Sequence, residues 1–260
     1  MESKPSIEDI RRRRVVYSVP GMAEVRKREA QPYKSTAGSP LCFDLYTPNH
    51  APERCPAVIL VHGGPIPVLG ARRAGVFVSY GELLAASGMV GIAFDHRYLE
   101  SDAVPVAAAD LADLISHIRE HATSLGIDEN RLAVWAFSGG GLLLATVLRE
   151  RPSWCRLVIA YYALMEPINA AHDGMHSAIA ALGRDAADDP AILVARAGRD
   201  DPQINATLDR FVSAAIEAGA TVDLLTHPTG HHGFDIFDSD ERSRQIIRRT
   251  LDALRSSLGV

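Results

Sequence analysis

Cysteine is scarce in this sequence of 260 residues, and no two cysteines form a Cys-x-x-Cys motif. The three that occur, Cys42, Cys55 and Cys155, are odd in number and lie far apart. Disulfide frameworks and structural zinc sites need paired or clustered cysteines. The sequence therefore predicts thiols in a reducing compartment, with no disulfide framework and no metal site built on cysteine.

Long apolar runs and a strong charge of either sign are also missing. No stretch reaches the roughly 20 apolar residues that a helix needs to cross a bilayer. Residues 1–5 lead into charged residues without the pattern of a secretory signal, so we expect a cytoplasmic protein. The net charge is only −5, which gives no electrostatic reason to expect nucleic acid or a membrane as a partner. The basic run at residues 11–14 indicates the solvated face of a short N-terminal helix.

Composition and length fit one globular domain. The apolar content is 47% and the charged content is 23%, both ordinary for a folded chain. We expect residues 1–260 to form a single α/β domain. Within it, residues 1–40 are predicted to form an N-terminal extension with edge strands at 15–19 and 23–29.

The rest of the chain alternates between strands and helices. A strand with alternating polarity is expected at residues 41–46, and the later strands are continuous apolar runs typical of a buried parallel sheet. These later strands are predicted at residues 56–61, 89–94, 132–136, 156–162, 191–197 and 221–227. Helices are predicted at residues 80–87, 106–125, 205–218 and 239–258, and a further helix runs from the glycines after Ser138 to residue 149. Gly126 is the expected C-cap of the helix at 106–125. Such alternation predicts an α/β fold: a mostly parallel sheet with an antiparallel N-terminal edge and helices on both faces.

A serine lies between a predicted strand and a predicted helix, in the sequence Ala136-Phe137-Ser138-Gly139-Gly140. So sharp a turn needs small residues two positions before and after the serine, and alanine adds only one methyl group. The arrangement resembles the nucleophile elbow of the α/β-hydrolases, whose usual pattern is Gly-x-Ser-x-Gly. The alternative is a glycine-rich turn that binds a phosphate or only reverses the chain.

Two later loops contain the partners that a serine nucleophile needs, a histidine base and an acid that orients it. The loop after the strand predicted at residues 191–197 contains Asp200 and Asp201. The loop after the last strand, at residues 221–227, contains His231 and His232. We assign His232 as the base because it precedes Gly-Phe in a short loop, and His231 could instead shape the pocket. We assign Asp200 as the acid. Asp201 is the alternative acid, or a helix-capping residue because a proline follows it.

The segment His62-Gly63-Gly64-Pro65 follows a predicted buried strand. Glycine allows backbone N–H groups to approach a substrate, so Gly63 and Gly64, together with Gly139, are expected to form an oxyanion hole. The alternative is an ordinary glycine turn. Because Pro65 has no N–H to donate, the hole depends on Gly64, with Gly63 as a further donor, and on Gly139.

These segments together resemble the α/β-hydrolase superfamily, nearest the hormone-sensitive-lipase-like and dienelactone-hydrolase-like carboxylesterases. The resemblance covers about residues 41–258. Besides the segments already named, it rests on Leu45-Tyr46-Thr47-Pro48, Asp95-His96-Arg97-Tyr98, Gly126-Ile127-Asp128 and Ala197-Gly198-Arg199-Asp200. It implies a serine hydrolase of esters, thioesters or amides that needs no cofactor and no metal.

Two positions depart from those relatives. The lipase-like members usually have a third glycine where Pro65 stands, and a dienelactone hydrolase proper has a cysteine where Ser138 stands. His-Gly-Gly-Pro is also similar to the catalytic domains of acylaminoacyl and prolyl peptidases, but this chain is too short for the propeller that those enzymes carry.

The resemblance therefore implies a serine carboxylesterase that acts on a small-molecule ester through an acyl-enzyme. The alternatives with the same triad are a small peptidase or amidase and an acyl transferase or thioesterase. A contrasting alternative is a binding protein that retains the fold without catalysis.

Residues 164–190 form a connection longer than usual between two strands, which often marks a functional insertion. They could form a small lid over an acyl pocket or a helix packed on the sheet. The residues expected to contribute are Met165, Ile168, His172, Met175, His176, Ile179 and Leu182.

Two further groups of polar residues have simple alternatives. His117 and His121 lie one helical turn apart, with Asp113 a turn earlier, and a solvated helix face is expected rather than a metal site. Arg72 and Arg73 either meet an anionic substrate or are surface charges.

Overall fold

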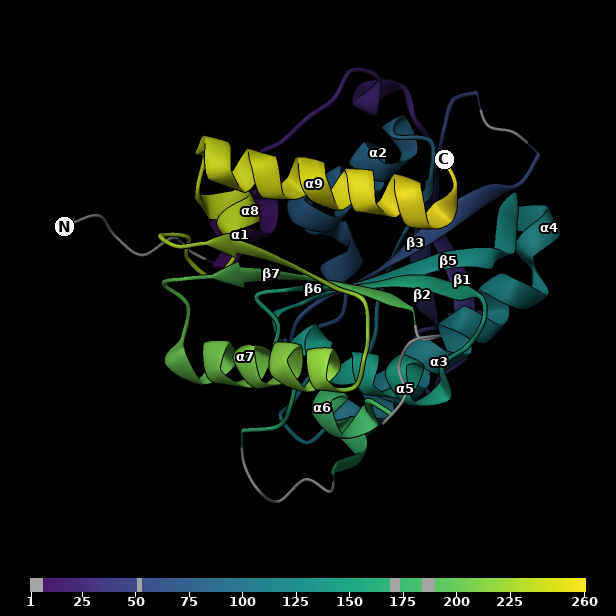
Figure 1. Cartoon of the computed structure of the whole chain (residues 1–260). Coiled ribbons are helices and arrows are strands. Elements are labelled where there is room, and N and C mark those ends of the chain that lie inside the picture. The colour runs from purple at the N-terminus through teal and green to yellow at the C-terminus, as the bar shows by residue number, and fades with distance from the viewer. Residues whose placement is uncertain (1–6, 51–52, 169–173, 184–189) are drawn as a thin grey trace.

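The computed structural model describes residues 7–50, 53–168, 174–183 and 190–260, and an eight-stranded sheet lies at its centre (Figure 1). In chain order the strands are β1 (Arg26–Lys34), β2 (Leu41–Thr47), β3 (Cys55–Val61), β4 (Val90–Phe94), β5 (Ile127–Phe137), β6 (Cys155–Tyr161), β7 (Ala191–Ala197) and β8 (Val222–His227). Their order in the sheet is β1-β2-β4-β3-β5-β6-β7-β8. β2 pairs antiparallel with both β1 and β4, and all other pairs are parallel. The prediction of a mostly parallel sheet with an antiparallel N-terminal edge is confirmed.

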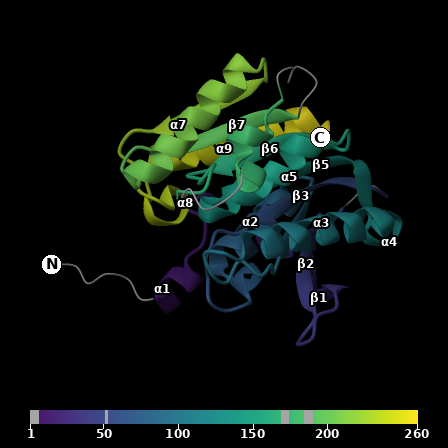
Figure 2. The same cartoon turned by 90° about the horizontal axis from the view of Figure 1, so that it is seen from below.

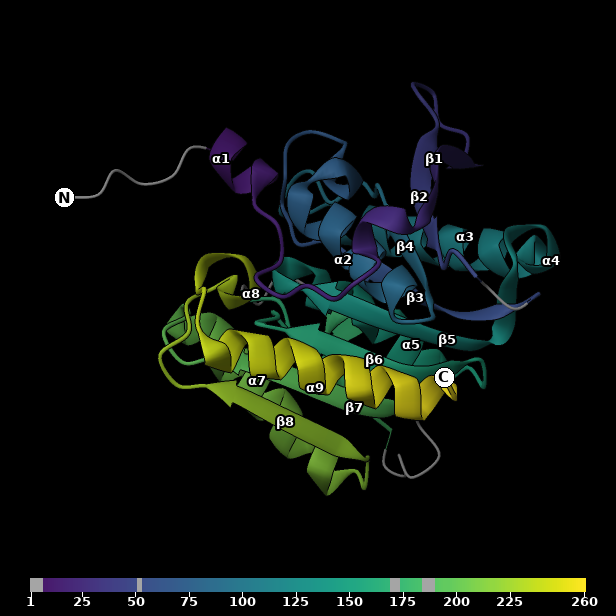
Figure 3. The same ribbon diagram turned by 90° about the horizontal axis from the view of Figure 1, so that it is seen from above.

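Helices cover both faces of this sheet. One face carries α2 (Gly75–Ala86) and α9 (Glu241–Leu258), with α1 (Ile7–Arg12) beside α2 and α8 (Phe234–Phe237) before α9 (Figure 3). The other face carries α3 (Val104–Glu120), α5 (Leu144–Glu150), α6 (Ala178–Ala181) and α7 (Pro202–Glu217), with α4 (Ala122–Leu125) at the end of α3 (Figures 1 and 2). Short 3₁₀ helices are η1 (Met22–Glu24), η2 (Ala71–Arg73), η3 (Ser138–Leu143) and η4 (Gly174–His176).

The core consists of two apolar layers because successive residues of a strand face opposite sides of the sheet. In β5, Leu132 and Val134 pack toward α3 and α5, whereas Ala133 and Trp135 pack toward α2 and α9. A strand with apolar residues at every position is therefore needed in the middle of this sheet. The apolar stripe predicted for the last helix, which consists of Ile246, Ile247, Leu251, Leu254 and Leu258, is buried.

Several predicted boundaries are wrong. Residues 15–19 form no strand, because their backbone bonds go to helices: the Val15 N–H donates to Ser79 Oγ and the Val16 N–H to the carbonyl oxygen of Asp235. The edge strand begins at Arg26, after η1, and not at residue 23. The helix expected over residues 106–125 is divided at His121 into α3 and α4, and Gly126 caps α4 in the left-handed conformation as predicted. The helix after Ser138 starts as a 3₁₀ helix, and α8 was not predicted.

None of the three cysteines, all in the described part of the chain, forms a disulfide. Among the described helices, none combines the length and the apolar character needed to cross a bilayer.

Candidate active site

Ser138 directly follows the carboxyl end of β5, near the middle of the parallel strands. Its φ angle is 54°, a left-handed value that is strained for a residue with a side chain and that persists only where the surroundings enforce it. The following glycines are needed for close approach: a Cβ at Gly139 would lie 2.4 Å from the carbonyl oxygen of Gly64. One at Gly140 would lie 2.7 Å from the carbonyl oxygen of His62. The turn thus presents the serine while packing its backbone against the segment after β3.

A chain of hydrogen bonds connects Ser138 to His232 and Asp200. His232 Nε2 lies 2.9 Å from Ser138 Oγ, and His232 Nδ1 lies 2.9 and 2.8 Å from the two carboxylate oxygens of Asp200. The Asp200 side chain is 2% exposed and the His232 side chain 40% exposed, so the acid is buried while the imidazole is partly open to solvent. With the acid on Nδ1, that nitrogen carries the proton and Nε2 is free to accept one from the serine.

The loops that carry Asp200 and His232 are joined through their backbones. The Gly198 N–H donates to the carbonyl oxygen of His227 at 2.8 Å, and the Arg199 N–H donates to that of Gly230 at 2.8 Å. A side chain at Gly198 would collide with Pro228, since its Cβ would lie 2.1 Å from the carbonyl oxygen. The loops after β7 and β8 therefore hold the acid and the histidine at a fixed separation.

The neighbouring residues of the same types have other partners. Asp201 Oδ1 accepts a hydrogen bond from the Gln203 N–H at 2.8 Å, and this residue is the N-cap of α7. His231 is exposed, and its Nδ1 lies 2.9 Å from Asp238 Oδ1. The structure brings Asp200 and His232, but not Asp201 or His231, to the serine.

The amide groups expected to form the oxyanion hole lie beside Ser138. A Cβ at Gly63 would lie 2.8 Å from the serine Cβ, and a Cβ at Gly139 would lie 3.2 Å from the Gly64 nitrogen. Gly64 also packs against a tyrosine, because its Cβ would lie 2.4 Å from Tyr98 Cδ1. Glycine is thus required here so that the two strand-end loops can approach each other and the serine.

Two buried histidines, His62 and His96, contact the backbone carbonyl groups of this segment. Their rings are stacked with centroids 3.5 Å apart. His62 Nδ1 lies 2.7 Å from the carbonyl oxygen of Gly63, and His96 Nε2 lies 3.2 Å from that of His62. Burial lowers the pKa of His62 to about 4 and lowers the pKa of His96 well below its ordinary value. Both rings are therefore neutral at neutral pH and can donate to those carbonyl groups. The sequence contained His96 in a segment noted for its resemblance, but nothing in it indicated this role.

A cavity of about 220 Å³ lies next to the elbow and the oxyanion segment, although Ser138 itself is not among the residues that line it. It is lined by Gly64 and Pro65, by Tyr98, and by Leu164, Pro167 and Ile168 from the segment after β6, among others. The Leu164 N–H donates to the carbonyl oxygen of Ser138 at 2.9 Å, which fixes this wall to the elbow. No charged side chain is among the described residues that line the cavity.

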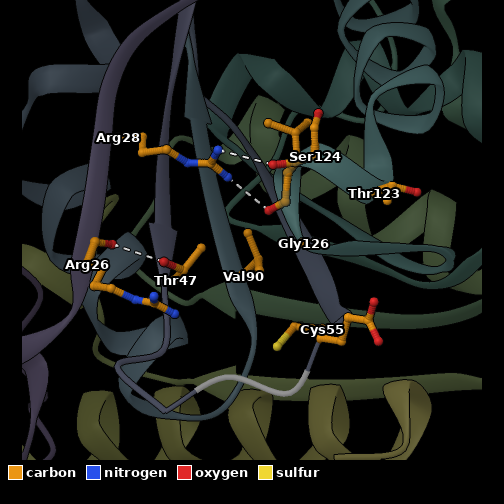
Figure 4. A pocket seen from close by; sticks show the side chains of 10 residues that line it. Arg26, Arg28, Thr47, Cys55, Val90, Thr123, Ser124 and Gly126 are labelled. Atoms are coloured by element: carbon orange, nitrogen blue, oxygen red, sulfur yellow. Dashed lines mark hydrogen bonds between the residues drawn. The ribbon is translucent and has the colours of Figure 1, made fainter.

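A second cavity, of about 400 Å³, lies at the other end of the sheet (Figure 4). Cys55, Val90 and Gly126 line it, at or just before the amino ends of β3, β4 and β5. Arg28 closes one side by donating to the carbonyl oxygens of Ser124 and Leu125 (Figure 4). Since Ser138 follows the carboxyl end of β5, this cavity is remote from the serine despite its greater volume.

The described parts of residues 164–190 divide between the cavity and the core. Ile168 is 49% exposed and lines the cavity, whereas Met165 is fully buried. Ile179 and Leu182 are partly buried and pack against the core on the α5 and α7 face. Met175 is 58% exposed and is not among the lining residues. His176 is buried, and His172 lies outside the described residues.

Arg72 is neither a substrate contact nor a surface charge. It is buried, its Nη1 lies 2.6 Å from both oxygens of Asp44, and its Nε donates to Asp95 Oδ2 at 3.0 Å. Arg73 is exposed. The ion cluster of Arg72, Asp44 and Asp95 fastens the loop after the oxyanion segment to the sheet.

The rings of His117 and His121 stack at the end of α3, with centroids 4.3 Å apart; His121 is exposed, whereas His117 is half-buried against Phe43. Within the described ranges, no group of three or more His, Cys, Asp or Glu side chains is arranged to hold a metal ion.

Comparison with known proteins supports the fold. Residues 43–151 match the family model described as BD-FAE, and no curated protein matches the sequence. Three similar solved structures show the same architecture. A truncated carbohydrate esterase from gut microbiota is 18% identical with a TM-score of 0.73, covering 90% of this chain and 97% of its own. A bacterial heroin esterase is 17% identical with a TM-score of 0.75, covering 90% and 84%. LAE6, an α/β hydrolase enzyme from the metagenome of Lake Arreo, Spain, is 21% identical with a TM-score of 0.74, covering 92% and 84%. The chain has the α/β-hydrolase fold, as its sequence predicted.

Proposed function

We propose, from the α/β-hydrolase fold and the partial match to the BD-FAE family model, that this protein is a cytoplasmic serine hydrolase that cleaves carboxylic esters. The observation that carries the proposal is the hydrogen-bonded series of Ser138, His232 and Asp200 beside the Gly64 and Gly139 amides. Two of the similar structures are esterases by name, which favours an ester over an amide. Three cysteines without a disulfide are compatible with a reducing compartment.

The proposed reaction begins when Ser138 Oγ attacks the ester carbonyl carbon and His232 Nε2 takes the hydroxyl proton. Asp200 holds the Nδ1 proton and stabilises the imidazolium that forms. The carbonyl oxygen becomes an oxyanion, to which the Gly64 and Gly139 N–H groups donate. His232 then gives its proton to the departing alkoxide, which leaves an acyl group on Ser138. Water, deprotonated by the same nitrogen, hydrolyses that acyl-enzyme and restores the serine.

The lining of the cavity beside Ser138 favours a substrate whose group on one side of the ester is uncharged and largely apolar. Its described lining has no charged side chain, so a charged group would find no ionic partner among those residues. The volume of about 220 Å³ admits a small or moderate acyl or alkyl group. Tyr98 and Ser101 are polar contacts within reach of that group.

The test is the hydrolysis of p-nitrophenyl esters of graded acyl length, measured beside aminoacyl p-nitroanilides. We expect turnover of the esters and little or none of the amides. His232→Ala should lower kcat by about 10⁴-fold or more, whereas His231→Ala, the matched control, should retain most of the activity. Preferential cleavage of the amides would make the protein a peptidase with the same triad. No turnover of either class would favour a binding protein on this fold.

A further inference from the structure

Tyr162 is the residue after β6, and its backbone is held in an unusual conformation. Its φ angle is 37°, which is strained for a residue with a side chain. The Tyr162 N–H donates to the carbonyl oxygen of Ala195 at 2.8 Å, and the side chain is buried. Backbone strain of this kind is often found at active sites, and Tyr162 lies at the same edge of the sheet as Ser138.

The ring of Tyr162 packs against the imidazole of His232. The ring centroids are 4.7 Å apart and the planes cross at 61°, which is an edge-to-face contact. Among the described residues, Asp200 at Nδ1 and Ser138 at Nε2 orient His232 within the plane of its ring. With 40% of its side chain exposed, the imidazole gains from this ring contact a restraint against tilting out of that plane.

Asp235 anchors the hydroxyl group of this tyrosine. The Tyr162 hydroxyl donates to Asp235 Oδ1 at 2.8 Å, and the Tyr80 hydroxyl donates to Oδ2 at 2.8 Å. Asp235 is completely buried, three residues after His232, at the start of α8. The titratable groups that act on it are Tyr80 from α2, Tyr161 and Tyr162 from the end of β6, and His232 from the loop after β8. A buried carboxylate that accepts from two tyrosines fixes the tyrosine side chain more firmly than packing alone.

We propose that Tyr162 is a positioning residue for His232, that Asp235 anchors it, and that Asp235, when ionised, stabilises the imidazolium formed during ester hydrolysis. The inference rests on the proposed function, because it assigns a role in the reaction of Ser138. Charge and geometry act together here: the aromatic ring restrains the imidazole, and the carboxylate behind the ring attracts the positive charge that the imidazole gains.

Tyr161 supplies a matched control. It precedes Tyr162, is also buried, and its hydroxyl also makes one buried hydrogen bond, with Thr250 Oγ1 at 2.6 Å. Its ring packs on Trp135 and Phe234, within the core on the α9 side of the sheet. Tyr161→Phe and Tyr162→Phe therefore remove the same group from similar surroundings, and only the second loosens a residue that touches His232.

The experiment measures kcat and KM on the best p-nitrophenyl ester across pH for the wild type and four variants. Tyr162→Leu removes the aromatic contact and should lower kcat by about tenfold, the upper end of what one such contact supports. Tyr162→Phe keeps the ring and loses only its hydrogen bond to Asp235, so it should lower kcat by about twofold. KM should be unchanged, since Tyr162 does not line the cavity beside the serine. Tyr161→Phe should retain the wild-type kcat.

Asp235→Asn should move the acid limb of kcat/KM to lower pH. An ionised Asp235 favours the protonated imidazole, so its removal makes the inactive protonated base harder to form. A residue with only a packing role would leave this limb in place.

Two results would overturn the inference. One is a kcat within twofold of wild type for folded Tyr162→Leu together with an unshifted acid limb for Asp235→Asn. The other is an equal loss of kcat in Tyr161→Phe and Tyr162→Phe. If a Tyr162 variant fails to fold, the pH dependence of kcat/KM for Asp235→Asn alone decides whether the inference holds. Failure of the proposed function is distinguishable, because then the wild type itself would not hydrolyse esters.

Discussion

Asp200 and Asp201 are adjacent in the chain, yet their carboxylates serve different structures. Asp200 faces His232, with both oxygens within 2.9 Å of Nδ1, and it also accepts from the Asp201 N–H at 2.7 Å. Asp201 turns toward α7 and caps its first turn. The proline after Asp201 is at the first helical position of α7, where it requires no N–H partner, so the helix begins there and directs the two side chains apart.

Asp200→Asn should lower kcat by about 10⁴-fold, because an amide at this position favours the wrong histidine tautomer. Asp201→Asn should change activity little, since asparagine is also a good N-cap. Both are measured as kcat on the same ester. A greater loss for Asp201→Asn would transfer the role of the acid to that residue, and small equal losses would contradict the assignment of a triad.

The two adjacent arginines should differ in stability rather than activity. Arg72→Met leaves the buried carboxylates of Asp44 and Asp95 without their cation, which should lower the free energy of unfolding by about 3–5 kcal/mol. Arg73→Met removes an exposed charge and should change it by less than about 0.5 kcal/mol. Urea unfolding of both variants measures the difference. Similar values would mean that the buried cluster contributes no net stability.

The parts of the molecule that could be predicted from the sequence are those encoded locally. Central strands such as β3 and β7 are apolar at nearly every position, and the loops after β7 and β8 carry the acid and the histidine in the expected chain order. Residues 15–19 have the composition of a strand, but their backbone partners come from distant helices. Tertiary packing determines those partners, and a local sequence pattern cannot predict them.

Tyr162 and Asp235 could not be predicted for a related reason. The hydrogen bond between Tyr162 and Asp235 joins residues 73 positions apart in the chain. Tyr80, which also donates to Asp235, is 155 positions away from it. Each looks ordinary in sequence, an aromatic residue at the end of a strand and an acid in a short helix. Their significance depends on the parallel order of the sheet, which brings the loops after β6 and β8 to one edge.

Acyl-chain preference should depend on Ile168 and not on Met175. Ile168→Trp places a larger side chain at the wall of the cavity beside the serine, so the preferred acyl group should become shorter. Met175→Trp is the matched control, because Met175 is similarly exposed but lies outside that wall. The measurement is kcat/KM over a series of p-nitrophenyl esters. A change in preference for Met175→Trp alone would locate the acyl pocket beneath η4 and α6.

Asp235 should make stability fall as pH rises. Burial raises the pKa of Asp235 to about 6, so the folded state binds the proton more tightly than the unfolded state does. The stabilisation is complete below about pH 4, the pKa of an unfolded aspartate, and is lost as pH rises through about 6.

Relative to Asp235→Asn, the wild type should therefore lose roughly 3 kcal/mol of unfolding free energy over this interval. Urea unfolding of both proteins at several pH values provides the measurement. A wild-type advantage that grows with pH would show instead that the two tyrosine hydroxyls outweigh burial.

The central claim is that Ser138 is the nucleophile, and covalent labelling tests it most directly. A fluorophosphonate probe should add one adduct to the wild-type protein, located by peptide mass spectrometry on Ser138, with loss of ester hydrolysis in the same proportion. Ser138→Ala should fold normally, take no label and hydrolyse no ester. An adduct on another residue, or ester hydrolysis that survives in Ser138→Ala, would contradict the claim.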